Sequence, residues 1–274
     1  MVKNDKTEIK KNWALVTGGS SGIGMELSKL LAKDGYSLII VAKPQEELDR
    51  AKAWFDENMP KTKIVYKQMD LGVQGSAIQL YDFTTQNKYN IDILINNAGF
   101  GASGPHFELD MDRILEMLNL NVITNWQLTR LYVKDMMAKD HGKILITSST
   151  AAFVPAVNSA AYSASKAFSY SYALAANHEL IDKGSKVRIT VLCPPVTHTG
   201  FAKAAGMENS KAYAKDSKMA YTADFVAAEA YKALMKGKRI VIPGRFMRTF
   251  VKVINPMSRT GRVVTLMKIS AKQQ

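Results

Sequence analysis

Cysteine is nearly absent from this chain of 274 residues. The single cysteine, Cys193, has no partner for an internal disulfide, so a disulfide-rich secreted scaffold is excluded. The four histidines are scattered and lack the neighbouring cysteines or paired carboxylates of metal sites, and we expect no metal. With 17 glycines and 8 prolines, the chain is neither collagen-like nor of low complexity. This composition indicates a globular protein of a reducing compartment.

Long apolar runs are also missing. No segment approaches the roughly 18 consecutive apolar residues that span a bilayer. The first residues, MVKNDKTEIKKNW, are charged and contain no apolar stretch of a signal peptide. Because 47% of the residues are nevertheless hydrophobic, the chain can bury one large core. We therefore expect a cytoplasmic protein that is neither exported nor membrane-spanning.

Acidic residues are absent from the C-terminal part of the chain. Residues 231–274 contain eleven lysines or arginines and no aspartate or glutamate, and the whole chain carries a net charge of +13. Apolar residues at helical spacing within 245–274 predict a basic amphipathic extension. It either packs on the core, a pocket or a second subunit, or lies peripherally on the anionic inner surface of a membrane. We expect no nucleic acid, because no reading motif is present.

The order of apolar patterns predicts an α/β protein. Short β-branched runs alternate with longer helical patterns, which is typical of βαβ units in a parallel sheet. We therefore predict a Rossmann-like, doubly wound parallel sheet of about seven strands with helices on both faces. The strands are expected at 12–17, 37–42, 63–67, 91–95, 142–147, 187–193 and 238–242. The helices are expected at 22–34, 44–57, 73–87, 110–139, 159–182 and 222–236.

A glycine-rich turn joins the first predicted strand to the first predicted helix. It reads Thr-Gly-Gly-Ser-Ser-Gly-Ile-Gly over residues 17–24. Glycines let a backbone turn tightly and approach a ligand, and the free N–H groups at a helix N-terminus favour a pyrophosphate. The alternative is a merely flexible turn. The spacing is GxxxGxG rather than the commoner GxGxxG, but its place after the first strand favours a dinucleotide site.

Three motifs together resemble the short-chain dehydrogenase/reductase family. They are TGGSSGIG at 17–24, NNAG at 96–99 and YSASK at 162–166, and the resemblance covers about residues 12–243. The stretches 98–101 and 193–199 look like the bacterial branch of uncharacterised carbonyl reductases. No linker or repeat splits the chain, so we expect one dinucleotide-binding and catalytic domain over 1–244, with the extension 245–274 belonging to it. The long segment of low periodicity at about 194–221 is expected to be a substrate loop. The resemblance implies a homodimer or homotetramer formed through 110–139 and 159–182.

Tyr162 and Lys166 form the candidate catalytic pair. They are four residues apart in a predicted helix, so both side chains lie on one face. A tyrosine titrates near pH 10, and a nearby cation stabilises its phenolate, so we expect Lys166 to lower the pKa of Tyr162. The resemblance adds Ser149 as the group that binds the substrate oxygen and Asn121 as the residue that holds a water linking Lys166 to solvent. Their rivals are Ser148, Asn119 and Asn125.

The resemblance also implies the reaction. A hydride passes from C4 of the nicotinamide to a carbonyl carbon while Tyr162 donates a proton to its oxygen, and Lys166 also contacts the nicotinamide ribose. We expect reduction of a small ketone, aldehyde or 3-oxoacyl substrate to an alcohol. Apolar residues in the segment 194–221 and in the tail suggest that the substrate is apolar. These residues are Phe201, Met207, Tyr213, Met219 and Phe246. The alternative is a catalytically silent NADP(H)-binding regulator or scaffold held at a membrane by its basic tail.

The choice of coenzyme depends on the end of the second strand. Ala42 stands where an acidic side chain would accept hydrogen bonds from the ribose hydroxyls of NAD, and Lys43 can pair with a 2′-phosphate. NADP(H) is therefore expected, with NADH possible, although Lys43 could also be a solvated residue before a helix that starts at Pro44. Pro195 stands where the family usually has glycine. The expected coenzyme contacts are Gly18, Ser20, Ser21, Gly22, Ile23, Gly24, Lys43, Asp70, Leu71, Asn97, Ala98, Gly99, Tyr162, Lys166, Pro194, Thr197 and Thr199.

Overall fold

A parallel sheet of seven strands forms the centre of the protein. The computed structural model describes residues 12–207, 213–214, 217, 220–258 and 260–261. The sheet has the order β3-β2-β1-β4-β5-β6-β9. All of its strand pairs are parallel, as predicted. Its strands are β1 (Trp13–Thr17), β2 (Ser37–Ala42), β3 (Ile64–Gln68), β4 (Ile91–Asn96), β5 (Lys143–Thr147), β6 (Arg188–Leu192) and β9 (Ile240–Val241).

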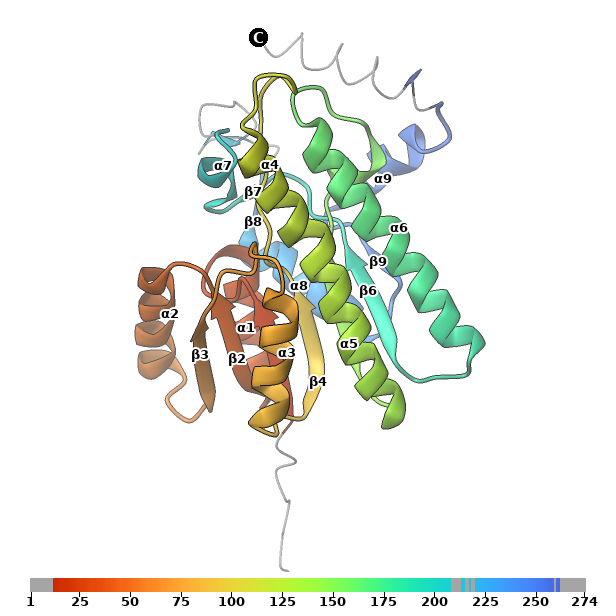
Figure 1. Cartoon of the computed structure of the whole chain (residues 1–274). Helices are drawn as coiled ribbons and strands as arrows, with labels where there is room; N and C mark the ends of the chain where they lie inside the picture. Colours follow the sequence, from red (N-terminus) through yellow and green to blue (C-terminus); the bar gives the residue numbers. More distant parts are fainter. Residues whose placement is uncertain (1–11, 208–212, 215–216, 218–219, 259, 262–274) are drawn as a thin grey trace, which may run out of the picture.

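Helices cover both faces of this sheet (Figure 1). One face carries α1 (Gly22–Lys33), α2 (Gln45–Asn58) and α8 (Ala223–Met235). The other face carries α3 (Ser76–Gln86), α5 (Asn125–Ala138) and α6 (Ala160–Asp182). Within the described ranges, none of the helices combines the length and the apolar content that crossing a membrane requires.

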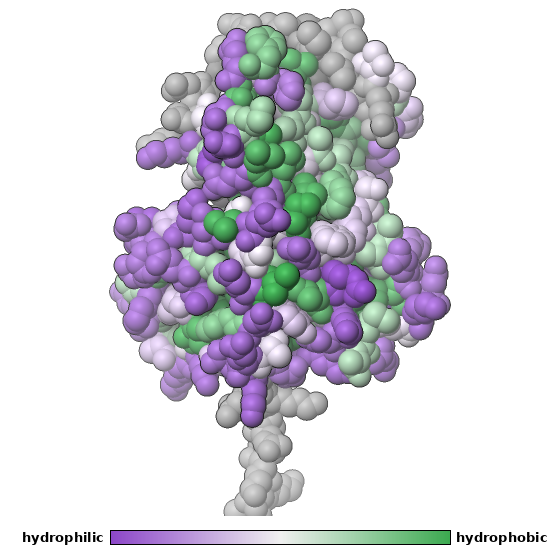
Figure 2. Space-filling model, in the orientation of Figure 1, coloured by the Kyte–Doolittle hydropathy of each residue, from purple (hydrophilic) through white to green (hydrophobic). Residues whose placement is uncertain are grey.

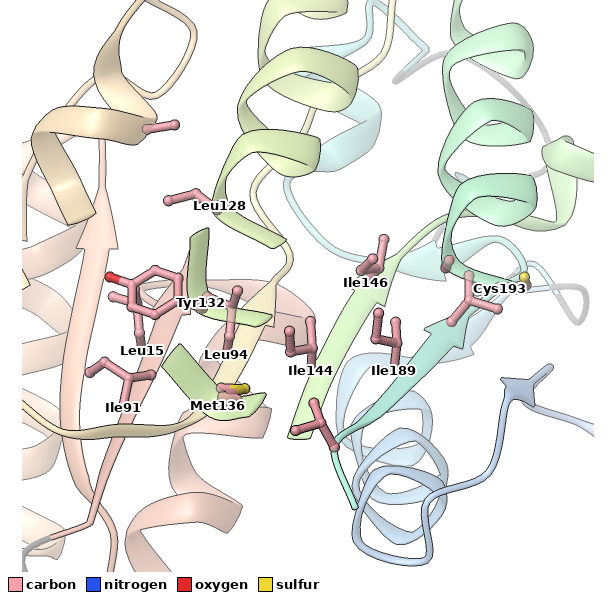
Figure 3. Close-up of a cluster of buried hydrophobic side chains, with 14 of the residues drawn as sticks. Leu15, Ile91, Leu94, Leu128, Tyr132, Met136, Ile144, Ile146, Ile189 and Cys193 are labelled. Carbon is pink, nitrogen blue, oxygen red and sulfur yellow. The ribbon is translucent and has the colours of Figure 1, made fainter. Parts of the chain in front are cut away.

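Two buried clusters lie on opposite faces of the sheet. Side chains alternate along a strand, so Ala14 and Val16 of β1 enter the cluster beneath α1, α2 and α8, whereas Leu15 enters the other. Figure 3 shows this second cluster, in which Leu15 lies with Tyr132 of α5 and Ile144 of β5. Because both faces are buried, the strands read as continuous apolar runs, which is why their positions can be predicted from the sequence.

The helix predicted over 110–139 is interrupted in the structure. It begins as α4 (Met111–Leu118), continues as one π-helical segment at Asn119–Thr124, and ends as α5. The side chain of Asp110 caps α4 by accepting a hydrogen bond from the N–H of Arg113. A π-helical turn changes the rotation of the residues within it. Asn121 lies in this turn and is buried.

The segment predicted as a substrate loop, 194–221, has more order than its pattern indicates. β7 (Thr197–His198) pairs in parallel with β8 (Tyr221–Thr222), and the short helix α7 (Phe201–Ala204) lies between them in the chain. Met219, one of the expected apolar residues, lies outside the described residues. The two-residue strands were missed because they are too short to show a period.

The basic extension starts with a helix that packs on the core. α9 (Arg245–Ile254) buries Val251 and Ile254 in the same cluster as Leu15. On the other side of this helix, Phe246 and Val253 are 70% and 66% exposed. The prediction that the extension packs on the core therefore holds for Val251 and Ile254 but not for Phe246 and Val253. Residues 259 and 262–274 of the predicted extension lie outside the described residues.

Close backbone packing fixes the glycine-rich turn. A Cβ added at Gly24 would lie 1.9 Å from the carbonyl oxygen of Gly18 and 2.6 Å from Nδ2 of Asn97. No side chain fits there unless the turn moves away from the end of β4. By contrast, a Cβ at Gly200 has no atom within 4 Å, and the φ of Gly200 is −65°.

We predict that Gly24→Ala lowers the free energy of unfolding by about 2 kcal/mol, in the range of overpacked cores. Gly200→Ala is the matched control, and it should change the value by less than about 0.5 kcal/mol. Urea unfolding followed by circular dichroism measures both. Equal stability of the two variants would contradict the tight packing of Gly24.

Candidate active site

The glycine-rich turn leaves the N-terminus of α1 free to meet an anion. Gly18 and Gly22 adopt φ values of +61° and +52°, which favour glycine. Ser21 precedes the helix without a side-chain cap, and the first turn, which includes Ile23, contains no acidic residue. Thr199 packs against Gly22, 3.0 Å from the position of an added Cβ. These features fit the pyrophosphate of a dinucleotide.

The hydroxyls of Ser20 and Ser21 both point to one carboxylate. Each donates a hydrogen bond to Oε2 of Glu47, at 2.8 and 2.9 Å. Glu47 lies in the first turn of α2. The sequence does not indicate this contact, because a glutamate in the first turn of a helix is expected there for the helix dipole alone.

Lys43 follows β2 and lies between two carboxylates. Its Nζ is 2.7 Å from Oδ2 of Asp70 and 2.9 Å from Oε1 of Glu116. These hydrogen bonds raise the pKa of Lys43 above its ordinary value. Glu116 also contacts Nη1 of Arg113 at 3.0 Å. Glu116 and Arg113 were missed, because nothing in the pattern of α4 indicates which residues face the end of β2.

One other expected coenzyme contact of this part of the site, Leu71, has different surroundings, and the helix after β2 starts one residue later than expected. Leu71 is buried in the core cluster with Leu15, and its carbonyl oxygen accepts hydrogen bonds from Ser76 and Thr124. Pro44 is the residue before α2 rather than its first residue. Asp70, in contrast, lies beside Lys43 at the site.

The residues after β4 join the ends of three strands. Nδ2 of Asn97 donates to the carbonyl oxygens of Thr17 and Gly18, and its Oδ1 accepts from the hydroxyl of Thr147. Ala98 lies against the turn, since its Cα would be 3.0 Å from a Cβ on Gly18. Asn97 therefore holds β1, β4 and β5 in register where the site forms.

Tyr162 and Ser149 lie together at the start of α6 and the end of β5. The hydroxyl of Ser149 is hydrogen-bonded to Tyr162 and also accepts the N–H of Ala151 at 3.0 Å. Ser148, the rival of Ser149, instead donates to the carbonyl oxygen of Lys166 at 2.7 Å. Of the two serines, Ser149 is the one that the structure brings to Tyr162.

Lys166 is a buried cation with one protein acceptor. Its side chain is 3% exposed, and Nζ donates to the carbonyl oxygen of Thr147 at 3.0 Å. Burial lowers the pKa of Lys166 to about 8. Nζ lies 5.8 Å from the centroid of the Tyr162 ring, so the ends of the two side chains lie close together.

Asn121 completes this group from the π-helical turn. Its Nδ2 donates to the carbonyl oxygen of Phe100 and to the hydroxyl of Ser165. Its Oδ1 is buried and has no hydrogen-bond partner among the described residues. A Cβ on Gly99 would lie 2.7 Å from this oxygen and 3.2 Å from Nζ of Lys166. The rival Asn119 is bonded elsewhere, to the carbonyl oxygen of Gly72.

An aromatic lid, formed by Phe201 and Tyr213, covers Tyr162, and the pKa of Tyr162 differs from the expectation. Phe201 of α7 lies 5.5 Å from the Tyr162 ring, and Tyr213 lies 6.5 Å from Phe201. Burial raises the pKa of Tyr162 well above 10, while the hydrogen bond from Ser149 opposes the rise. This pKa is therefore not lowered as expected, because desolvation by burial outweighs the hydrogen bond from Ser149.

The stretch after β6 is held by its own hydrogen bonds. Pro194 accepts the N–H of Thr150 at 3.0 Å, and Thr197 donates to the carbonyl oxygen of Pro195 at 2.8 Å. Thr197 is buried, so its hydroxyl is directed to this loop. Arg113 anchors the lid that follows, since its Nη2 donates to the carbonyl oxygen of Ala204 at 3.2 Å.

Known proteins are similar to this chain over most of its length. The family model for short chain dehydrogenases matches residues 12–210. The uncharacterised oxidoreductase DltE of Bacillus subtilis is 30% identical over 199 residues, which are 70% of this chain and 74% of that protein. A very-long-chain 3-oxoacyl-CoA reductase of Mus musculus is 30% identical over 197 residues, but the match spans only 61% of its length.

Solved structures agree with the fold. A short-chain dehydrogenase from Sphingobium yanoikuyae in complex with NADPH has a TM-score of 0.78 and 23% identity, covering 89% of this chain and 92% of that one. A short-chain dehydrogenase/reductase from Burkholderia phymatum in complex with NAD has a TM-score of 0.80 and 21% identity, covering 89% and 93%.

The fold and the site define an oxidoreductase with a Rossmann-like domain. More specifically, the chain belongs to the short-chain dehydrogenase/reductase family, as its family-model match over residues 12–210 shows.

Burial of Lys166 predicts a stability that depends on pH. With a folded pKa of about 8 and an ordinary value of 10.5, the unfolded chain binds more protons between these limits, so stability rises with pH there. We expect Lys166→Met to stabilise the protein by about 2 kcal/mol at pH 7, and the gain should vanish near pH 10.5.

Urea unfolding at several pH values between 7 and 10.5 measures this difference. The control is Lys183→Met, which replaces an exposed lysine at the end of α6 and should show no such trend. A difference between Lys166→Met and wild type that stays constant with pH would contradict the lowered pKa of Lys166.

Proposed function

We propose that this protein is an NADP(H)-dependent reductase that converts a carbonyl to an alcohol with Tyr162 as proton donor. The observation that carries the proposal is the convergence of Tyr162, Ser149 and Lys166 beside the unpartnered Oδ1 of Asn121. A structural network would pair that buried oxygen, because leaving it unpaired costs free energy. Its position near Lys166 fits a water that carries protons.

The coenzyme supplies the hydride, and the protein's own residues handle the substrate oxygen and the proton. Ser149 and Tyr162 are close enough to hydrogen-bond the same carbonyl oxygen, which orients the carbonyl carbon and polarises it. Tyr162 is protonated near neutral pH, as a tyrosine with an ordinary pKa also is, so it can donate its proton to that oxygen. Lys166 stabilises the phenolate that remains, and the water at Asn121 returns the proton through Lys166.

The residues present fit a dinucleotide along the carboxyl ends of the strands. Gly18, Gly22 and Gly24 leave no room for side chains, which lets a pyrophosphate approach the N-terminus of α1. Lys43 lies where a 2′-phosphate is expected and supports NADP(H), with NADH also possible. Gly99 keeps the space between Asn121 and Lys166 free of a side chain, as the nicotinamide end requires.

The lid supports an apolar substrate. Phe201 and Tyr213 lie over Tyr162, and Phe100 is buried close by in the cluster that contacts Tyr162. A carbonyl group carried on an acyl chain or a ring would contact these aromatic faces while its oxygen reaches Ser149. The curated relative named as a 3-oxoacyl-CoA reductase supports an acyl substrate of that class.

Exposed apolar side chains support a homodimer or homotetramer. They follow one surface from α4 to α5, and Figure 2 shows hydrophobic residues gathered around the middle of this face. These side chains are Met111, Leu115, Ile123 and Trp126. Joining two copies there would cover them, in agreement with the subunit contact expected for 110–139.

We predict that Tyr162→Phe lowers turnover of a carbonyl substrate at least about a hundredfold, because it removes the donated proton. The affinity for NADPH should stay within about twofold, since the ring remains in place. The assay follows loss of NADPH absorbance, and a fluorescence titration gives the affinity.

The control is Tyr170→Phe, a half-buried tyrosine on the same helix whose ring packs on Phe153. It should keep wild-type turnover. Full activity of Tyr162→Phe would remove Tyr162 from the role. A wild-type protein that binds NADPH but turns over no carbonyl in a broad screen would favour the regulator or scaffold instead.

The exposed half of α9 supports a second role, peripheral contact with an anionic membrane. Phe246 and Val253 are seven residues apart and therefore share one face, and Arg245 and Lys252 are exposed beside them. An amphipathic helix of this kind binds a bilayer through apolar burial and attraction to anionic lipid. Arg248 faces Glu229 instead, at 3.7 Å.

We predict that the protein floats with vesicles containing phosphatidylglycerol and much less with pure phosphatidylcholine. The double variant Arg245→Gln/Lys252→Gln should bind the anionic vesicles roughly thirtyfold more weakly, at about 1 kcal/mol for each cation. Phe107→Ser, which changes a phenylalanine that is 86% exposed outside α9, is the control. Equal flotation with both lipids would exclude this contact.

A further inference from the structure

The end of β2 carries an excess of acidic groups around the expected 2′-phosphate position. Lys43 is one cation, and the carboxylates of Asp70 and Glu116 both contact its Nζ. Glu47 adds a third carboxylate on the neighbouring turn, where Ser20 and Ser21 donate to it. The glycine-rich turn lies beside the end of β2, since Gly18 and Gly19 both donate to the carbonyl oxygen of Val41.

An inventory of hydrogen-bond donors shows what a phosphate would meet. An ammonium group has three donors, and two of those on Lys43 are already directed to carboxylates. The hydroxyl hydrogens of Ser20 and Ser21 are both directed to Glu47. A phosphate at this corner therefore gains its full set of donors only if Glu47 and Glu116 withdraw, and their negative charges repel it meanwhile.

A ribose hydroxyl meets a different environment at the same corner. It can donate a hydrogen bond to a carboxylate, so Asp70, Glu116 and Glu47 are acceptors for it rather than obstacles. The same carboxylates therefore weaken the binding of NADPH and favour that of NADH. Lys43 alone does not decide the preference.

We propose that Glu47 and Glu116 are specificity-determining residues that reduce the preference of this enzyme for coenzymes bearing a 2′-phosphate. The inference rests on the proposed function, because it takes Lys43 and the glycine-rich turn as the adenosine end of the coenzyme site. Glu47 acts by occupying Ser20 and Ser21. Glu116 acts by occupying Lys43, and its second oxygen is held by Arg113 at 3.0 Å, which keeps the carboxylate directed there.

The two residues can be tested by neutral variants of the same shape. Glu47→Gln and Glu116→Gln keep the side-chain size and remove the charge. Each should raise the ratio of NADPH affinity to NADH affinity about tenfold, through tighter NADPH binding, and the double variant should raise it further. The affinities are measured on the purified full-length protein by fluorescence titration with each coenzyme.

The neighbouring Glu46 provides a matched control. It lies on the same first turn of α2, is exposed, and makes no contact with Ser20 or Ser21 in the described part of the chain. Glu46→Gln should leave the ratio within about twofold of wild type. A calorimetric titration with 2′,5′-ADP and with 5′-AMP repeats the comparison without the nicotinamide, so the result does not depend on turnover.

Several outcomes would overturn the inference. A ratio unchanged in both Gln variants, while wild type binds NADPH, would refute the role of the two glutamates and leave the proposed function intact. A ratio that falls would mean that Glu116 positions Lys43 for the phosphate. An equal rise of the affinity ratio in Glu46→Gln would mean that the effect comes from the general loss of negative charge and not from the contacts of Glu47 and Glu116. Wild-type protein that binds neither coenzyme would overturn the proposed function as well.

Discussion

Parallel pairing of β1 with both β2 and β4 is the constraint on which the rest of the structure depends. It is enforced by burial on both faces of the sheet, where Leu15 and Val16 enter opposite clusters. Parallel strands end at the same edge of the sheet, so the glycine-rich turn, Lys43 and Asn97 all lie along that edge. The amide of Asn97 then connects this edge to β5 through Thr147. Hydrogen bonds of Asn97 thereby connect the glycine-rich turn to the end of β5.

Burial has opposite effects on the pKa values of Tyr162 and Lys166. It lowers the pKa of Lys166 to about 8, because the cation is the form that loses solvation, and it raises the pKa of Tyr162, because the phenolate is that form. Phe201 packs against the Tyr162 ring, so the lid contributes to the burial that raises the pKa of Tyr162. Arg113 connects the lid to α4, whose Glu116 contacts Lys43, so the two ends of the site are in physical contact.

The predicted strands and helices agree with the structure to within a few residues in the central sheet, because strands buried on both faces and amphipathic helices have clear periods. Prediction was weaker where the period is short or broken. β7 and β8 have two residues each, and the π-helical turn interrupts one long helical pattern at Asn119–Thr124. The choice of Ser149 over Ser148 follows from the resemblance, and the structure supports it, because Ser149 is hydrogen-bonded to Tyr162 whereas Ser148 donates to the carbonyl oxygen of Lys166.

The sequence by itself determined the doubly wound parallel fold, the family, and the candidate tyrosine, lysine, serine and asparagine, because these follow from periodicity and from motif spacing along the chain. Tertiary structure decided which charges meet. Glu47 and Glu116 are distant in sequence from the serines and the lysine that they contact, and the lid that raises the pKa of Tyr162 comes from α7 and Tyr213. Electrostatic environment depends on distance and burial in space, and neither is encoded in local spacing.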